Sequence, residues 1–245
     1  MQHCGLTSVT FRHLSWLENI CVACECGLQG IEWGGDIHCP PGDVALAQEI
    51  AKATREAGLA VLSYGSYYRL GAGEDFAPVL ASAVALGAPI IRVWAGTKAS
   101  AKYTAEERKL AIEDALRIAS QAAVHGITVA LEYHRDSLTD NAKSAVDLLQ
   151  TAGNMKTYWQ PNPELTCEQN LQELQAVLPW LTYVHVFQWK HDGTRLALQD
   201  GTEDWAAYFA LAGERTAILE FVKDNCPAQC AQDANTLKAL TQITN

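Results

Sequence analysis

Eight short apolar runs recur along the sequence, and this repeat constrains the fold more than any other feature. Amphipathic helical segments separate the runs, and several runs are apolar at consecutive positions, which is typical of parallel strands covered on both faces. Eight such units within 245 residues predict a single-domain α/β protein, a (β/α)8 TIM barrel over residues 1–245. The runs span residues 4–9, 28–34, 59–65, 89–95, 127–133, 155–160, 182–188 and 216–222.

Capping residues mark where several of the intervening helices begin. Asp43 precedes one helical stripe, and Gly58 follows it. The segments Thr104-x-x-Glu107 and Thr166-x-x-Gln169 are capping boxes. A doubly wound sheet is the alternative architecture, but no glycine-rich dinucleotide fingerprint or Walker loop follows a strand.

Charge and cysteine usage narrow the function further. With 18 Lys+Arg against 28 Asp+Glu, the net charge of −10 disfavours a nucleic-acid partner. No signal peptide and no long apolar run is present, so we expect a cytoplasmic protein without membrane contact, as a monomer or homodimer. The cluster Cys21-x-x-Cys24-x-Cys26 lacks a second zinc-binding pair. We therefore expect reduced thiols, with Cys21 and Cys24 facing the core.

Polar residues interrupt the apolar runs near their carboxyl ends, where TIM barrels build their sites. Glu132 stands between Leu131 and Tyr133, and Glu220 between Leu219 and Phe221, so alternation turns each carboxylate into the barrel mouth and its neighbours toward the helices. Two carboxylates, an imidazole and an amide form a donor set for Mn²⁺, Mg²⁺, Co²⁺ or Zn²⁺. The alternative is a set of separately satisfied buried groups, for instance a Glu32–Arg92 ion pair. The interrupting residues are Glu32, Arg92, Glu132, Gln160, His185 and Glu220.

Five segments resemble the xylose isomerase-like TIM barrels, a superfamily that includes sugar-phosphate isomerases and epimerases, inosose dehydratases and endonuclease IV. The resemblance implies a divalent metal held by Glu132, Gln160, His185 and Glu220. Gln160 replaces the Asp that the family carries at this point, so the metal would be bound more weakly, be completed by substrate or be absent. The segments are GIEWGGDIH at 30–38, IRVWAG at 91–96, LEYH at 131–134, VHV at 184–186 and LEF at 219–221.

The same resemblance implies a metal-assisted isomerase or epimerase that acts on a sugar, sugar phosphate or keto-polyol. Glu132 and Glu220 would be the catalytic pair, transferring a proton through an enediolate. A dehydratase of a keto-polyol or dehydroshikimate-type acid and a non-catalytic sugar-binding barrel are the alternatives. Endonuclease activity conflicts with the negative charge.

Residues near the strand ends are candidates for contacting the substrate. Tryptophans there suit the apolar face of a sugar, and they are Trp33, Trp94, Trp159 and Trp189. We expect the binding residues to be His38, Arg92, Trp94, His134 and Arg195.

Overall fold

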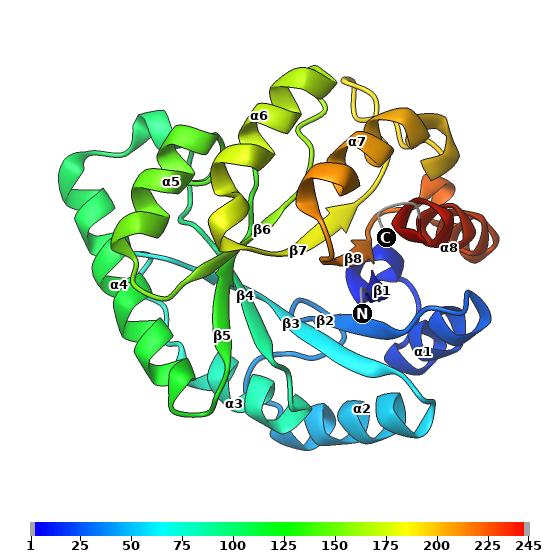
Figure 1. The fold of residues 1–245 in the computed structure, drawn as a ribbon. Coiled ribbons are helices and arrows are strands. Elements are labelled where there is room, and N and C mark those ends of the chain that lie inside the picture. Colours follow the sequence, from blue (N-terminus) through cyan, green and yellow to red (C-terminus); the bar gives the residue numbers. More distant parts are fainter. Residues whose placement is uncertain (1–2, 243–245) are drawn as a thin grey trace.

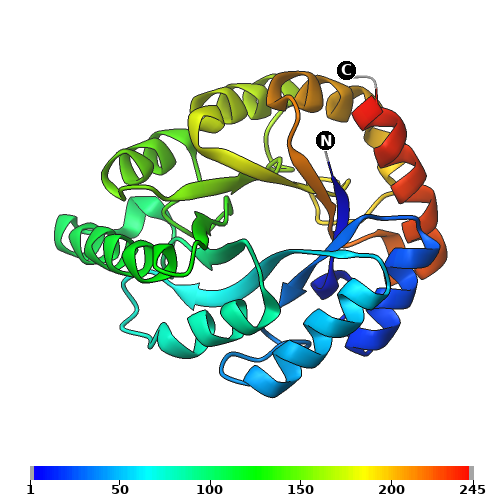
Figure 2. The same ribbon diagram turned by 60° about the horizontal axis from the view of Figure 1, so that its bottom comes forward.

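The eight apolar runs form eight parallel strands that close into a barrel, each hydrogen-bonded to the next and β1 to β8 (Figures 1 and 2). The computed structural model describes residues 3–242, so the predicted TIM barrel is confirmed over that range and residues 1–2 and 243–245 lie outside it. The strands are β1 (Cys4–Thr7), β2 (Gly30–Gly34), β3 (Ala60–Arg69), β4 (Ile90–Trp94), β5 (Thr128–Leu131), β6 (Lys156–Trp159), β7 (Leu181–Val186) and β8 (Thr216–Leu219).

A helix follows each strand and covers the outside of the barrel (Figure 1). The predicted caps are present: Asp43 Oδ1 accepts from Leu46 N–H at 3.0 Å, and both the Thr104 and Thr166 capping boxes are formed. The helices are α1 (Trp16–Glu25), α2 (Val44–Glu56), α3 (Ala77–Leu86), α4 (Ala105–Ala123), α5 (Ala142–Thr151), α6 (Cys167–Val177), α7 (Thr202–Ala212) and α8 (Pro227–Gln242).

Strand alternation divides the apolar side chains into two groups. A small cluster, Leu62, Ile90, Ala130, Tyr158 and Ile218, fills the inside of the barrel. The larger core lies between strands and helices and includes Leu131, Tyr133 and Leu219, as predicted. The inner cluster closes the barrel interior, which leaves the carboxyl ends of the strands as the open face.

Two sequence expectations about packing are wrong. Phe221 does not join the core under the helices, because it has a φ of 50° that turns its side chain to the cavity at the carboxyl ends. Cys21 and Cys24 are exposed on α1, whose buried face is made by Ile20, Val22 and Ala23 instead. All eight cysteines are free. No helix within residues 3–242 has the length and apolar character needed to span a bilayer.

Candidate active site at the carboxyl ends of the strands

Three of the predicted site residues stand directly after their strands, and the fourth lies within β7. Glu132, Gln160 and Glu220 follow the last residues of β5, β6 and β8. At Glu132 and Glu220 the backbone still hydrogen-bonds to the neighbouring strand. Glu132 N–H donates to Val93 O and Glu220 N–H donates to Val186 O, each at 2.9 Å. The strand ladder therefore fixes the direction in which both carboxylates leave the barrel wall.

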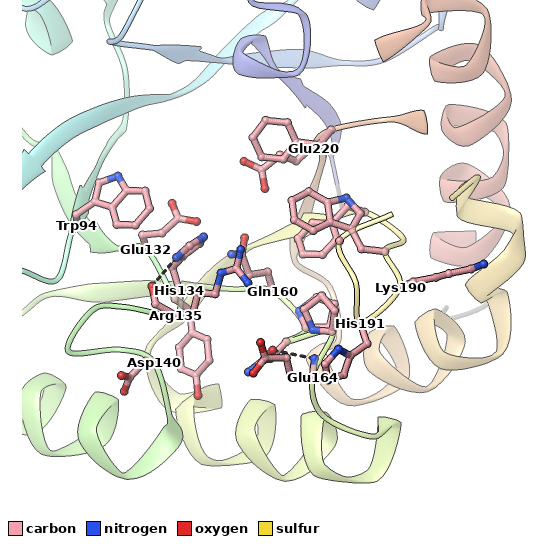
Figure 3. A pocket seen from close by; sticks show the side chains of 18 of the residues that line it. Trp94, Glu132, His134, Arg135, Asp140, Gln160, Glu164, Lys190, His191 and Glu220 are labelled. Carbon is pink, nitrogen blue, oxygen red and sulfur yellow. Dashed lines mark hydrogen bonds between the residues drawn. The ribbon is translucent and has the colours of Figure 1, made fainter. Parts of the chain in front are cut away.

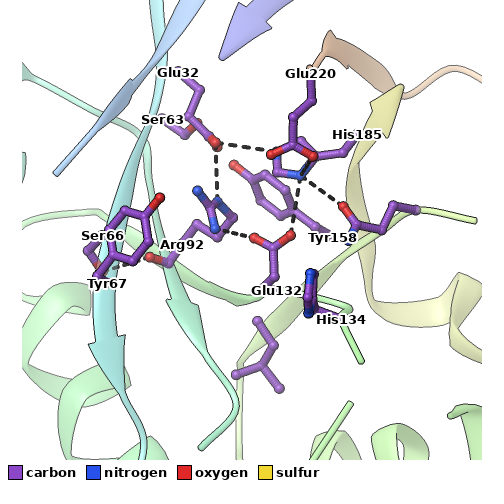
Figure 4. Close-up of polar contacts among 12 residues, drawn as sticks. Glu32, Ser63, Ser66, Tyr67, Arg92, Glu132, His134, Tyr158, His185 and Glu220 are labelled. Atoms are coloured by element: carbon purple, nitrogen blue, oxygen red, sulfur yellow. Dashed lines mark hydrogen bonds and ion pairs between the residues drawn. The ribbon is translucent and has the colours of Figure 1, made fainter. Parts of the chain in front are cut away.

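These four side chains meet at Nδ1 of His185 (Figure 4). This nitrogen lies 3.3 Å from Gln160 Oε1, 3.4 Å from Glu132 Oε1 and 3.7 Å from Glu220 Oε2. Glu132, His185 and Glu220 are all buried. The structure thus brings together the four residues that the sequence proposed as metal ligands.

A third buried carboxylate faces the opposite edge of the imidazole. Glu32 Oε1 lies 3.3 Å from His185 Nε2, which is an ion-pair distance, although the geometry is not that of a hydrogen bond. The same oxygen accepts from Arg92 Nε at 3.2 Å, and Arg92 also pairs with Glu132. The Glu32–Arg92 ion pair that the sequence left open as an alternative is therefore present, within the same cluster as the four donors.

The electrostatics divide Glu132 from Glu220. Burial raises the pKa of Glu132, but Arg92 and His185 outweigh it and hold the pKa at about 2. Burial raises the pKa of Glu220 above its ordinary value; His185 opposes this rise, and Glu132 reinforces it. Burial lowers the pKa of His185, yet the three surrounding carboxylates raise it to about 10. One carboxylate is thus held ionised, and the other is the more basic.

Glu132, Gln160 and Glu220 line a cavity of about 230 Å³ that opens at the carboxyl face of the barrel, whereas His185 and Glu32 are fully buried and do not line it (Figure 3). Trp94 and His134, two of the residues proposed to bind substrate, stand on its wall with their ring centres 4.8 Å apart. Arg92 also lines the cavity, although two carboxylates already engage it. The other lining residues include Arg12, Tyr67, Arg135, Gln160, Glu164, Phe187, Trp189, Lys190, His191 and Phe221.

Two predicted binding residues lie elsewhere. His38 is buried beside the segment that follows β1, where its ring nitrogens contact Ser8 Oγ at 3.0 Å and Leu14 O at 2.9 Å, and it does not line the cavity. Arg195 stands behind the cavity wall, with its guanidinium carbon 5.7 Å from the Trp189 ring centre. His38 follows β2 in sequence, but the turn after the strand carries it away from the mouth.

The tryptophans at the strand ends have two different roles. Trp94 and Trp189 line the cavity. Trp33 and Trp159 are fully buried in the core between strands and helices. Strand-end position alone does not separate the two pairs, because each tryptophan's place depends on the side of the barrel wall to which its strand turns it.

Sequence reasoning missed the residues that rim the cavity from the first loops. Arg12 follows the 3-10 helix η1 (Ser8–Phe11), where it pairs with Asp36 and donates to the Tyr67 hydroxyl. Tyr67 belongs to the last part of β3, which continues four residues past its predicted end. The sequence offers one signal for Arg12, which is its position shortly after the first apolar run. Arg12 does not interrupt a run as Glu132 and Glu220 do, so this position alone did not single it out.

The four donors around His185 Nδ1 are of the types that bind divalent metals. Among residues 3–242, no group of three or more His, Cys, Asp or Glu side chains already has metal-binding geometry. Adjacent ligands of an ion bound at about 2.1 Å lie roughly 3.0–3.4 Å apart. Gln160 Oε1 at 3.3 Å and Glu132 Oε1 at 3.4 Å from His185 Nδ1 match this spacing, and Glu220 Oε2 at 3.7 Å would have to move closer. Charge fits as well: Glu32 and Arg92 neutralise each other, and Glu132 with Glu220 would balance one divalent cation. The residues present therefore suit such an ion.

Comparisons with known proteins agree with the architecture. A family model described as a xylose isomerase-like TIM barrel matches residues 22–240. A 3-dehydroshikimate dehydratase of Bacillus anthracis is 24% identical in an alignment 201 positions long, which covers 74% of this chain and 70% of that protein.

Solved structures share the fold over nearly the whole chain. The probable 3-DHS dehydratase AsbF of Bacillus anthracis has a TM-score of 0.81 at 20% identity, covering 97% of this chain and 99% of that one. An L-ribulose 3-epimerase has a TM-score of 0.75 at 14% identity, covering 100% and 96%. At such identities the likeness establishes the fold, and the chemistry has to be argued from the site.

Proposed function

The chain belongs to the xylose isomerase-like TIM barrel family, and from that premise we propose that it is an isomerase or epimerase of a small sugar, sugar phosphate or keto-polyol. The reaction moves a proton at a carbon next to the carbonyl group, through an enediolate. One observation carries this proposal: Glu132 and Glu220 face the same point beside His185, with pKa values shifted in opposite directions. Two carboxylates held in different protonation regimes are typical of an acid–base site.

Glu220 is the group to which we assign the proton transfer. A general base works best when its pKa approaches the working pH, and burial shifts Glu220 in that direction. Glu132 is a poor base, because Arg92 holds one of its oxygens and stabilises the charged form. Its part is to remain ionised and to fix the site's geometry and charge.

A divalent metal fits this scheme. Glu132, Gln160, His185 and Glu220 would hold it, and when bound it would supply Lewis acidity that polarises the carbonyl and stabilises charge on its oxygen. Because the Gln160 amide is neutral, the four ligands would carry two negative charges, one each from Glu132 and Glu220. These two charges would neutralise one divalent ion in the buried site without a third carboxylate. Gln160 is thus compatible with metal binding, although it adds no charge of its own.

The cavity wall suits a small polar substrate. Trp94 and Trp189 offer flat apolar faces, and His134 offers a ring nitrogen for a hydroxyl group. The small volume and the enclosed floor favour a monosaccharide-sized molecule over a polymer.

The test is solvent exchange at the reacting carbon. Purified protein with Mn²⁺ is incubated in D2O with a panel of ketoses, ketose phosphates and inososes, and deuterium is located by NMR and mass spectrometry. We expect deuterium next to the carbonyl, together with an isomeric product. Glu220→Gln should reduce exchange by about 10²–10⁴-fold. Glu113→Gln is the matched control, because it makes the same carboxylate-to-amide change on the exposed face of α4, outside the cavity, and it should retain activity.

Dehydration of a carboxylated keto-polyol is the second candidate. It is favoured by the dehydratase relative and by Arg135 and Lys190, which line the mouth and have no ion pair within residues 3–242 to occupy them. A substrate carboxylate would suit these cations. With a single basic carboxylate, Glu220 would take the proton and then protonate the departing hydroxyl.

Product analysis separates the remaining readings. Release of water with a new enone or aromatic chromophore identifies dehydration, whereas an isomer of unchanged mass identifies isomerisation or epimerisation. Ligand binding without deuterium exchange on any member of the panel would instead support a sugar-binding barrel without turnover and contradict both enzymatic proposals.

A further inference from the structure

We propose that Glu32 and Arg92 are positioning residues of the metal site, and that this buried pair decides which atoms of His185 and Glu132 face the ion. The inference rests on the proposed function, because it concerns the same four donors. Neither residue touches the point where the donors meet. Glu32, on β2, acts on His185 across the barrel, and Arg92, on β4, acts on Glu132 after the neighbouring strand β5 (Figure 4).

Glu32 orients the imidazole. Its side chain is fully buried, Oε2 accepts from Ser63 Oγ at 2.7 Å, and Oε1 lies 3.3 Å from His185 Nε2. An ion held by Nδ1 would replace the proton on that nitrogen and leave the ring proton on Nε2. Glu32 Oε1 is the carboxylate that faces Nε2, so it would hold the ring with Nδ1 toward Glu132, Gln160 and Glu220. This is the arrangement of a carboxylate–histidine–metal triad.

Arg92 makes the corresponding choice for Glu132. Its guanidinium NH1 donates to Glu132 Oε2, while its Nε donates to Glu32 Oε1 at 3.2 Å. Because Oε2 is occupied, Oε1 is the oxygen of Glu132 that remains for the ion, and it lies 3.4 Å from His185 Nδ1. One oxygen of Glu32 thus ties the orientation of His185 to that of Arg92, and through Arg92 to Glu132.

The intervening strand is shaped to hold this pair. On β3, Ser63 is in register with Glu32, and Gly65 is in register with Arg92. A Cβ on Gly65 would come within 2.7 Å of Arg92 NH2 and 3.1 Å of Glu32 Oε1. Gly65 does not have a positive φ, so its backbone conformation does not require glycine. The missing side chain instead leaves room for the Glu32–Arg92 ion pair.

A purely structural pair would behave differently. If Glu32 and Arg92 only neutralised each other inside the barrel, removing the Glu32 charge would lower stability without a specific effect on metal binding. A positioning pair loses metal affinity in a protein that is still folded. Metal binding is therefore the readout that separates the two roles.

The experiment titrates Mn²⁺ into the full-length protein and follows free Mn²⁺ by EPR. We expect Glu32→Gln to weaken binding by about 10–100-fold, the usual cost of removing the carboxylate partner of a metal-binding histidine. Asp233→Asn is the matched control: it makes the same carboxylate-to-amide change at a buried position, in α8, where Asp233 accepts from Leu198 N–H. Its affinity should equal that of the wild type. Circular dichroism confirms folding of each variant.

A second variant keeps the proposal testable if Glu32→Gln does not fold. Gly65→Ala preserves every charge and displaces the Arg92 guanidinium, so it should weaken Mn²⁺ binding several-fold. In the Zn²⁺-loaded protein with 15N-labelled histidine, the His185 Nε2–H proton should resonate far downfield beside Glu32. It should move upfield in Glu32→Gln, a change that a structural role does not predict.

The outcomes separate this inference from the function on which it rests. Wild-type affinity in folded Glu32→Gln, or in folded Gly65→Ala, overturns the positioning role alone and leaves the metal-assisted reaction standing. If the wild type binds no Mn²⁺ at millimolar concentrations, the metal-assisted function and the positioning role are both wrong.

Discussion

The guanidinium carbon of Arg195 lies 4.8 Å from the centre of the Phe221 ring, directly beside the residue that we assign as the base. Phe221 has a φ of 50°, a conformation that bulky residues rarely adopt, and Arg12 also approaches its ring, at 5.6 Å. Such strain persists only where the surroundings hold it, and it gathers at functional sites. The two arginines thus hold the ring that closes the cavity beside Glu220.

Arg195→Ala should lower kcat/KM by about 2- to 5-fold, since a cation–π contact of this exposure is worth about 0.5–1 kcal/mol. The loss should be equal for neutral and anionic substrates, because Arg195 acts through Phe221 and does not line the cavity. Steady-state kinetics on a ketose and its phosphate measure both.

Lys223→Ala is the control for this change, as it removes one positive charge from the turn after β8 without losing an aromatic contact. It should leave kcat/KM unaltered. A loss in Arg195→Ala that exceeds about a hundredfold and affects only anionic substrates would mean that Arg195 binds the substrate directly, as the sequence suggested.

The sequence predicted much of the site because period-two alternation is local information. Glu132, His185 and Glu220 each stand between apolar neighbours, so their inward direction could be read without a structure. Alternation failed at Phe221, where a positive φ turns the chain directly after the strand. A single dihedral outside the strand region cannot be read from the residue type of a phenylalanine.

The contacts across the barrel could not be predicted in the same way. Glu32 and His185 come from β2 and β7, which are not neighbours in the sheet, and their contact depends on barrel closure. The sequence allows Arg92 either to bind substrate or to join an ion pair, and the geometry places two carboxylates on it. The position of His38 could not be predicted for a related reason, since its ring contacts Ser8 of η1 and Asn19 of α1, which are distant in sequence from the turn after β2.

Gln160→Asp should raise the affinity for Mn²⁺ by about tenfold or more, because carboxylate count sets the strength of such sites. Without metal, the same variant should be less stable by about 1–3 kcal/mol, since it adds a carboxylate to a buried cluster that already holds three. Metal titration and urea unfolding in a chelator measure the two effects.

Gln160→Asn is the matched control, because asparagine has the length of aspartate without its charge. It should bind Mn²⁺ no better than the wild type. Equal affinities of the Asp and Asn variants would show that charge at this position does not govern the metal, and would contradict the charge balance argued above.

The start of α4 should carry a pH-dependent part of the stability. Lys98 donates to Glu107 at 2.6 Å, and Thr104 N–H donates to it at 2.8 Å, which together lower the pKa of Glu107 to about 2. A lowered folded-state pKa stabilises the protein above the unfolded value, and this contribution is lost as the pH falls from about 4.5 toward 2. Glu107→Gln should therefore lower the Tm at pH 7, with the difference shrinking below pH 4.5.

Glu113→Gln is the control on the same helix, as it removes an exposed carboxylate outside the cap. Its Tm should follow the wild type from pH 3 to pH 7 by calorimetry. If the Tm difference between Glu107→Gln and the wild type stays constant down to pH 3, the lost stability comes from the altered hydrogen bonds of the capping box and not from the lost charge.

His134→Phe should raise KM by about tenfold while leaving Mn²⁺ affinity unchanged. The Nδ1 atom of His134 lies 2.6 Å from the Arg135 carbonyl oxygen, which can only accept, so Nδ1 carries the proton and Nε2 is left as an acceptor. We expect Nε2 to accept from a substrate hydroxyl, a bond worth about 1–1.5 kcal/mol. Phenylalanine keeps the packing on Trp94 and removes only this acceptor. His191→Phe at the cavity mouth is the control, and an equal rise in KM there would show that general polarity of the wall, not the His134 acceptor, governs binding.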